Sequence, residues 1–167
     1  MIETLELVLQ EYPFFAGLSA DHIKLITTCA KDVEFPEQHY IFRAGDLADY
    51  LYVIRDGLVS IELSTPDRGV TRLQAVDKGE VLGWSWIAPP YRWHFDARTL
   101  RHTHALAFDV DHLRAKCEED HGLGYAMMKR LTDVVVSRLD ATRLQLLDLH
   151  ASPASTRRSV KRGRQTG

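Results

Sequence analysis

The sequence predicts a mainly β protein with flanking helices (α+β class), built as a double-stranded β-helix or jelly-roll barrel. Three observations carry this prediction. Apolar residues follow helical spacing up to about residue 32 and again after about residue 111, whereas between these points they alternate with polar residues. Glycine-containing turns separate the alternating runs at spacings of roughly ten residues, as in antiparallel barrels and sandwiches. With 167 residues, 45% of them hydrophobic, the chain can bury one such core.

The predicted elements follow the chain in order. Two helices are expected at residues 3–11 and 19–31, separated by Pro13, with Ser19 suited to the first turn of the second. The clearest strands lie at residues 40–42, 50–54, 58–63, 71–76 and 105–108. A short helix at 111–119 and a long one at 124–150 complete the fold. We therefore divide the chain into an N-terminal helical segment (1–32), a barrel (33–110) with a pocket segment (79–95), C-terminal helices (111–150) and a basic tail (151–167).

The long helix carries a heptad-type apolar stripe. Packing against the barrel accounts for its first half, but the second half has more leucines than a solvent-exposed helix would carry. The sequence therefore predicts a homodimer through residues 124–150. The stripe steps by four and three residues through Val135, Leu139, Thr142, Leu146 and Leu149, with Met128 and Leu131 leading into it.

Charge is distributed unevenly along the chain. The net charge is −2, but residues 151–167 hold five basic residues and no acidic one, which leaves 16 basic and 23 acidic residues in the rest. So acidic a body would repel DNA phosphates. The 17 residues after His150 are too few for a helical reader domain, so we expect no sequence-specific DNA binding. The tail is predicted to be disordered, either a solvated extension or a non-specific contact for an acidic partner, nucleic acid or an anionic surface.

Other function classes find little support. No nucleophile elbow, HExxH motif or dinucleotide fingerprint occurs, so we expect no enzyme and no catalytic residues. His102-x-His104 and His94-x-Asp96 lack a fixed third ligand, so no metal site is predicted. Cys29 and Cys117 share no pairing motif, and no apolar run could span a bilayer, which favours a cytoplasmic protein.

Several motifs in register resemble the cyclic nucleotide-binding domain of bacterial catabolite-activator-type regulators, kinase regulatory subunits and gated channels. The resemblance covers roughly residues 12–150 and rests on Pro13-Phe-Phe-Ala-Gly-Leu, Phe42-Arg-Ala-Gly-Asp, Tyr50-Leu-Tyr-Val-Ile-Arg-Asp-Gly and Gly79-Glu-Val-Leu-Gly83. It implies a bacterial regulatory sensor module that binds cAMP or cGMP and acts through its C-terminal helix on an effector protein, which the sequence does not name.

The ligand-binding segment departs from the family pattern. The family holds the ribose and phosphate with Gly-Glu-x-x-Gly-Glu and, after about ten residues, Pro-Arg-x-Ala-(Ser/Thr). In this chain Gly83 is retained, but Trp84 replaces the ribose Glu, Trp93 the phosphate Arg and His94 the Ser/Thr, with Arg92 one place away. Losing two charge-assisted partners at about 1.5–3 kcal/mol each would weaken binding by on the order of 10²–10⁴. Cyclic-nucleotide binding in the usual pose is therefore disfavoured.

Two interpretations of the altered segment remain open. The aromatic residues could fill a cavity that a ligand once occupied, leaving a ligand-free dimeric scaffold. Alternatively, they could form a pocket for a different small ligand. Its stacking walls would be Trp84, Trp86 and Trp93, with Arg92 as a cation and His94 and Ser85 as polar contacts. No cofactor is certain under either interpretation. The candidate ligand-binding residues are Gly83, Trp84, Ser85, Arg92, Trp93, His94 and Thr142, the last on the family's base-contacting helix position.

Overall fold

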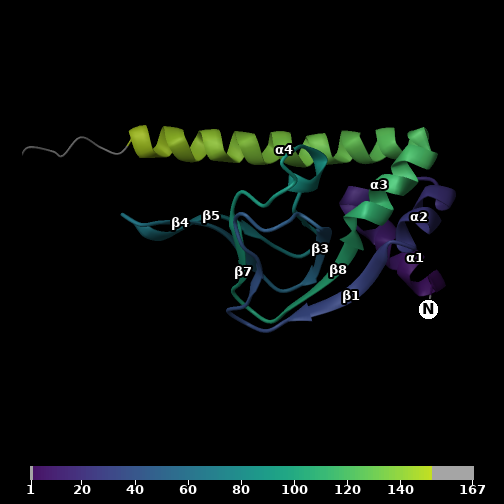
Figure 1. Ribbon diagram of the computed structural model, residues 1–167, viewed down its shortest axis with the longest axis horizontal. Helices are drawn as coiled ribbons and strands as arrows, with labels where there is room; N and C mark the ends of the chain where they lie inside the picture. Colours follow the sequence, from purple (N-terminus) through teal and green to yellow (C-terminus); the bar gives the residue numbers. More distant parts are fainter. Residues whose placement is uncertain (1, 152–167) are drawn as a thin grey trace, which may run out of the picture.

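Residues 2–151 are described by the computed structural model, with side chains from residue 5 onward. Two four-stranded antiparallel sheets face one another as a jelly roll, with helices gathered at one end and a long helix running across the molecule (Figure 1). The predicted fold class is therefore confirmed. The basic tail predicted at 151–167 lies, from residue 152 on, outside the described residues.

Three short helical elements precede the barrel: α1 (Ile2–Glu11), η1 (Pro13–Phe15) and α2 (Ala20–Thr27). Ser19 is the N-cap of α2, because its Oγ accepts a hydrogen bond of 3.1 Å from the His22 N–H. The prediction that this helix continues to residue 31 was wrong. It ends at Thr27, and the first strand begins at Ala30, where the chain pairs with Phe108.

The two sheets contain strands from distant parts of the chain. One has the order β1-β8-β3-β6, with β1 at Ala30–Phe35, β8 at Thr103–Asp109, β3 at Tyr50–Asp56 and β6 at Val81–Leu82. The other has the order β2-β7-β4-β5, with β2 at Tyr40–Phe42, β7 at Asp96–Thr99, β4 at Val59–Thr65 and β5 at Gly69–Val76. Each predicted strand has its counterpart here. β1, β6 and β7 were not among the strands expected most clearly: β1 is a charged edge strand, β6 has only two residues and β7 only four.

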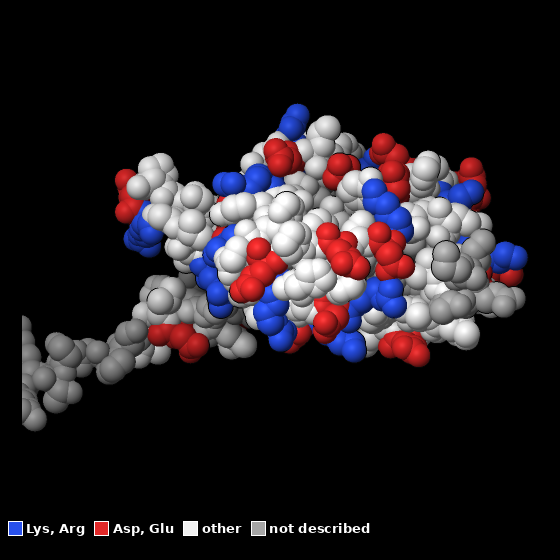
Figure 2. Space-filling model, turned by 90° about the horizontal axis from the view of Figure 1, so that it is seen from below, with Lys and Arg blue, Asp and Glu red and all other residues white. Residues whose placement is uncertain are grey.

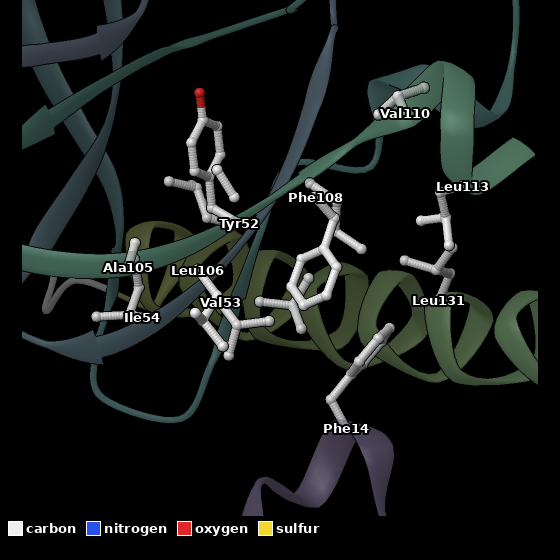
Figure 3. Packing of buried hydrophobic residues seen from close by; sticks show 14 of the residues in the cluster. Phe14, Tyr52, Val53, Ile54, Ala105, Leu106, Phe108, Val110, Leu113 and Leu131 are labelled. Atoms are coloured by element: carbon white, nitrogen blue, oxygen red, sulfur yellow. The ribbon is translucent and has the colours of Figure 1, made fainter. Parts of the chain in front are cut away.

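The core lies between the sheets and continues under the helices. Figure 3 shows Phe14 of η1 beside Leu131, with Phe108 of β8 and Leu113 next to them. Phe108 and Leu113 are fully buried, and Leu131 is 1% exposed. The N-terminal segment and the C-terminal helices are therefore fixed to the barrel through one shared apolar cluster.

Two helices follow the barrel: α3 (Val110–Glu119) and α4 (His121–His150). Asp120 is the N-cap of α4, accepting from the Leu123 N–H at 3.0 Å, so the helix begins earlier than the predicted residue 124. At about 1.5 Å per residue, its 30 residues span roughly 45 Å. Its C-terminal half runs over the β4–β5 hairpin (Figure 1), where Gln145 Nε2 donates to the Leu73 carbonyl at 3.1 Å.

The surface and the thiols are unexceptional within the described part of the chain. The face in Figure 2 mixes basic and acidic side chains and presents no dominant basic patch. Cys29 is buried and Cys117 half-buried, and both are free thiols whose pKa values are raised by burial. Among residues 2–151, no helix is apolar enough over a sufficient length to cross a membrane.

Candidate functional site

A cavity of about 330 Å³ lies between the barrel and α4. The barrel, the segment after β6 and one face of the long helix each provide part of its wall. Six of the seven predicted site residues line it, namely Gly83, Trp84, Ser85, Trp93, His94 and Thr142. The other lining residues are Phe42, Ile61, Leu73, Gln74, Leu82, Phe95, Val135, Arg138, Leu139 and Gln145.

The floor of the cavity depends on a close contact between Gly83 and Trp93. Gly83 has φ +92°, and a Cβ added there would lie 2.6 Å from Trp93 Cη2. A side chain at position 83 would therefore clash with the indole and also strain the backbone. Trp93 is 4% exposed and stacks on Phe42 with ring centroids 3.8 Å apart and planes 11° from parallel. The residue at the family's phosphate-Arg position has thus become part of the apolar floor.

The other two tryptophans differ in their roles. Trp84 is half-buried and lines the cavity, whereas Trp86 is 2% exposed and does not. Our expectation of three tryptophan walls was therefore wrong for Trp86, which the 3₁₀ turn η2 (Ser85–Ile87) directs into the core. Arg114 of α3 donates to the Trp86 carbonyl at 2.8 Å and lies 4.9 Å from the Tyr91 ring. The pocket segment is therefore attached to the helical end of the molecule.

Arg138 is a candidate site residue that sequence reasoning missed. It projects from α4 with 8% of its surface exposed, donates from Nη2 to the Val81 carbonyl, and lies 4.6 Å over the Trp84 ring. Among the described residues no carboxylate forms an ion pair with it, and burial lowers its pKa to about 10, with only the more distant Glu80 opposing. Its position four residues before Thr142, on the same helix face, is the sequence signal that could have identified it.

The polar groups around the cavity are few and largely engaged. Thr142 Oγ1 donates to the Arg138 carbonyl at 2.9 Å, so its hydroxyl proton is committed to the helix backbone while its oxygen can still accept. Of the lining residues in the described chain, Arg138 alone carries a permanent charge. The cavity thus combines aromatic and aliphatic walls with one buried cation.

Two groups near the site lie outside the cavity. Arg92 is exposed and donates from Nη1 to the Gly45 carbonyl at 2.7 Å, and it is not among the lining residues. Glu80, which the family pattern retains, accepts from the Asp77 N–H at 2.6 Å and closes the turn before β6. Neither residue lines the cavity, so the cation in its wall is Arg138 of α4.

Comparison with known proteins identifies the fold and the family. The sequence profile of the cyclic nucleotide-binding domain matches residues 32–120. Over 142 residues the chain is 27% identical to the CRP-like cAMP-activated global transcriptional regulator of Mycobacterium tuberculosis, covering 85% of this chain and 62% of that protein. The chain thus spans less than two thirds of this relative's length.

Solved structures agree on the fold. A cyclic nucleotide-binding domain from Methylobacillus flagellatus superposes with a TM-score of 0.76 at 17% identity, covering 91% of this chain and 85% of the other. The regulatory subunit of a cAMP-independent protein kinase A from Trypanosoma cruzi, bound to guanosine, gives 0.68 at 22% identity, covering 92% and 53%. These relatives are regulatory ligand-binding proteins and not enzymes. The profile match extends over more than half of the sequence, and the chain therefore belongs to the cyclic nucleotide-binding domain family.

Proposed function

We propose that this protein is a regulatory sensor module that binds a small, flat, largely apolar ligand with one anionic or hydrogen-bond-accepting group. The ligand would occupy the cavity under α4 and signal through that helix to a partner protein. The environment of Arg138 carries this proposal. The reduced thiols of Cys29 and Cys117 support the expected cytoplasmic location.

Burying a cation without a counter-ion destabilises the fold, because the charged group loses its hydration. Arg138 already has one backbone acceptor and an aromatic face, but five N–H donors cannot be satisfied by one carbonyl. An acceptor group on a ligand would meet the remaining donors and offset part of the desolvation cost. The aromatic rings of Trp84 and Trp93 would contact the flat body of the same ligand.

The type of ligand follows from two groups that the described cavity lining lacks, a carboxylate and an arginine at the family's phosphate position. Without a lining carboxylate, the pocket has no strong acceptor for a ribose hydroxyl, and Trp93 occupies the phosphate-Arg position. A cyclic nucleotide would therefore bind in an altered pose, with its phosphate toward Arg138, or not at all. The kinase regulatory subunit from Trypanosoma cruzi, solved bound to guanosine, supports including nucleosides without a phosphate among the candidates.

The proposed signal passes through α4. Leu139 and Thr142 belong both to the cavity wall and to the heptad-type stripe, which continues beyond the cavity as Leu146 (51% exposed) and Leu149 (72% exposed). A second copy docked on this stripe would contact the same helix face as the ligand. Ligand binding would then bias the pairing of two α4 helices and, through them, an effector protein.

A ligand-free scaffold is the second candidate. It is supported by the stack of Trp93 on Phe42, which fills space that the family leaves for the phosphate. In this case the remaining cavity would be an apolar packing defect, and the exposed leucines of α4 would carry the whole function as an interaction surface.

Calorimetric titration distinguishes the two candidates. We would titrate cAMP, cGMP and guanosine into protein refolded to remove carried-over ligand, and record tryptophan fluorescence in parallel. The sensor proposal expects one site per chain, with a change in tryptophan emission, and loss of the heat in Arg138→Met. Arg143→Met is the matched control, because Arg143 lies on the same helix with 65% of its side chain exposed.

Two results would count against the sensor proposal. No heat and no fluorescence change up to millimolar concentration of all three compounds would remove nucleotide-type effectors and favour the scaffold. Binding that Arg138→Met leaves intact would place the ligand elsewhere on the molecule.

A further inference from the structure

A second cluster of chemically reactive side chains lies at the β1–β8 edge of the barrel. Glu34 of β1 is in register with His104 of β8, so the two side chains lie on the same face of the sheet. His102 precedes β8 by one residue and returns to this face, with its ring centroid 4.9 Å from that of His104. The His-x-His pair was evident from the sequence. Its third member, Glu34, was not, because it comes from a strand nearly seventy residues earlier.

The donor atoms are spaced as a metal ion requires. Glu34 Oε2 lies 3.5 Å from His102 Nε2, and Glu34 Oε1 lies 3.4 Å from His104 Nδ1. One ligand atom from each residue can be chosen so that all lie within 4.8 Å of one another. Tetrahedral coordination at metal–ligand distances of about 2.0–2.1 Å places neighbouring ligand atoms roughly 3.3 Å apart. Each imidazole thus already lies near this distance from one of the two Glu34 oxygens, and rotation of these side chains can bring one ligand atom from each residue to it.

We propose that Glu34, His102 and His104 form a binding site for one divalent transition-metal ion of the zinc type. Two imidazoles and one carboxylate are a donor set that suits zinc and disfavours magnesium, which prefers oxygen ligands. Three protein ligands leave a fourth position for water or an external donor. The side chains of the three residues are 62%, 55% and 43% exposed, so an ion can reach them from solvent.

The site would add a side-chain cross-link to two strands that the backbone ladder already pairs from Ala30↔Phe108 to Phe35↔Thr103. β1 is the outer strand of its sheet, and its Glu34 end is the end remote from α3. An ion held by one ligand from β1 and two from β8 would cross-link this edge. Because the ion binds the folded arrangement and not the separated strands, it would raise the stability of the protein.

Ion pairing alone is the competing explanation of the cluster. An ion pair accounts for each contact taken singly. A metal ion also accounts for the convergence of both rings on one carboxylate, with their centroids 4.9 Å apart, because it can be bound by both imidazoles and the carboxylate together.

The test is a calorimetric titration of untagged full-length protein with Zn²⁺, repeated with Mg²⁺. We expect one equivalent of Zn²⁺ to bind, no Mg²⁺ to bind at the same concentrations, and the thermal midpoint to rise with Zn²⁺ only. His102→Ala/His104→Ala should abolish the one-equivalent step. Glu34→Gln, which keeps both imidazoles, should weaken it by at least about tenfold through loss of one ligand.

The control is His112→Ala, because His112 is 74% exposed and lies 3.8 Å from a carboxylate but outside the cluster. Its titration should match that of the unmodified protein. Since none of the substituted residues is buried, circular dichroism should show folded variants. Absence of the Zn²⁺ step in the unmodified protein, or its persistence in the double histidine variant, would overturn the proposal.

Discussion

At the scale of single residues, Arg138 connects stability with the proposed ligand binding. Its desolvation lowers the pKa to about 10, below the ordinary value for arginine, so the folded state holds the charge less readily than the unfolded chain does. Between these two pKa values the unfolded state therefore binds more protons than the folded state. The free-energy cost of burying the charged guanidinium is relieved only as pH rises above about 10. At neutral pH the group is charged in both states and its full cost is present.

We expect Arg138→Met to leave the free energy of unfolding unchanged or to raise it by up to about 3 kcal/mol, because a hydrophobic side chain of similar length removes a buried unpaired charge. The loss of the hydrogen bond to the Val81 carbonyl opposes part of this gain. Urea unfolding measures the difference, which should be the same at pH 7 and pH 9. Arg143→Met, at an exposed position, should change stability by less than about 1 kcal/mol. A loss of more than about 2 kcal/mol in Arg138→Met would show that the arginine stabilises the empty pocket.

Gly83 offers a second prediction at the residue scale. Gly83→Ala should destabilise the protein by about 2–4 kcal/mol, since the new methyl group meets both the Trp93 ring and a positive φ. Gly45 is the matched control, with φ +94° and nothing within 4 Å of an added Cβ. Gly45→Ala should therefore show only the backbone cost of about 1–2 kcal/mol. Urea unfolding of both variants separates the two effects, and equal losses would mean that Trp93 moves aside freely.

Residue-level prediction from sequence succeeded where a motif fixed the position. Gly83 and Trp84 follow a motif of fixed spacing, so their place beside the cavity could be predicted. Arg92 could not be placed in the same way, because whether a loop residue reaches the cavity depends on the local backbone, and here its guanidinium binds the Gly45 carbonyl. Arg138 was missed because its one sequence signal, a position four residues before Thr142, does not by itself distinguish a buried arginine on an amphipathic helix from an exposed one.

At the scale of elements, α4 has two distinct apolar faces. The stripe through Leu139, Leu146 and Leu149 continues the face that packs on the barrel, whereas Val136 and Leu147 lie about 120° round the helix. The heptad spacing predicted the stripe, and the structure divides it: Leu131 is buried in the core, while Leu146 and Leu149 extend past it. Periodicity could not show at which residue α4 leaves the barrel, because packing on a barrel and pairing with a second helix require the same apolar spacing.

We expect the purified protein to be a dimer of its 19.0 kDa chain at micromolar concentration, and Leu146→Lys/Leu149→Lys to make it monomeric. Two lysines on each of two facing helices would bring like charges together in an apolar seam. Light scattering after size exclusion measures the mass. Val136→Lys/Leu147→Lys is the control, because it adds the same charge on the other face and should leave the dimer intact. If only the control variant dissociates, the dimer uses the face of α4 that carries Val136 and Leu147.

At the scale of the whole molecule, the cavity and the proposed dimer seam share residues, so their equilibria should be linked. Leu139 and Thr142 line the cavity and belong to the stripe. A ligand that orders this part of α4 would strengthen helix pairing, and pairing would in turn raise ligand affinity by the same factor. Coupling of this kind typically amounts to about 5–150-fold.

The last prediction follows from this reciprocity. With whichever of cAMP, cGMP or guanosine binds, a saturating concentration should lower the dimer dissociation constant by at least about fivefold, as measured by sedimentation velocity over a dilution series. The monomeric variant Leu146→Lys/Leu149→Lys should bind the same ligand more weakly by an equal factor, because neither substituted residue lines the cavity and only the lost pairing changes the affinity. Val136→Lys/Leu147→Lys should retain both the dimer and the full affinity. Equal ligand affinities in the monomeric and dimeric proteins would separate the pocket from the helix seam and confine the ligand to a role within one chain.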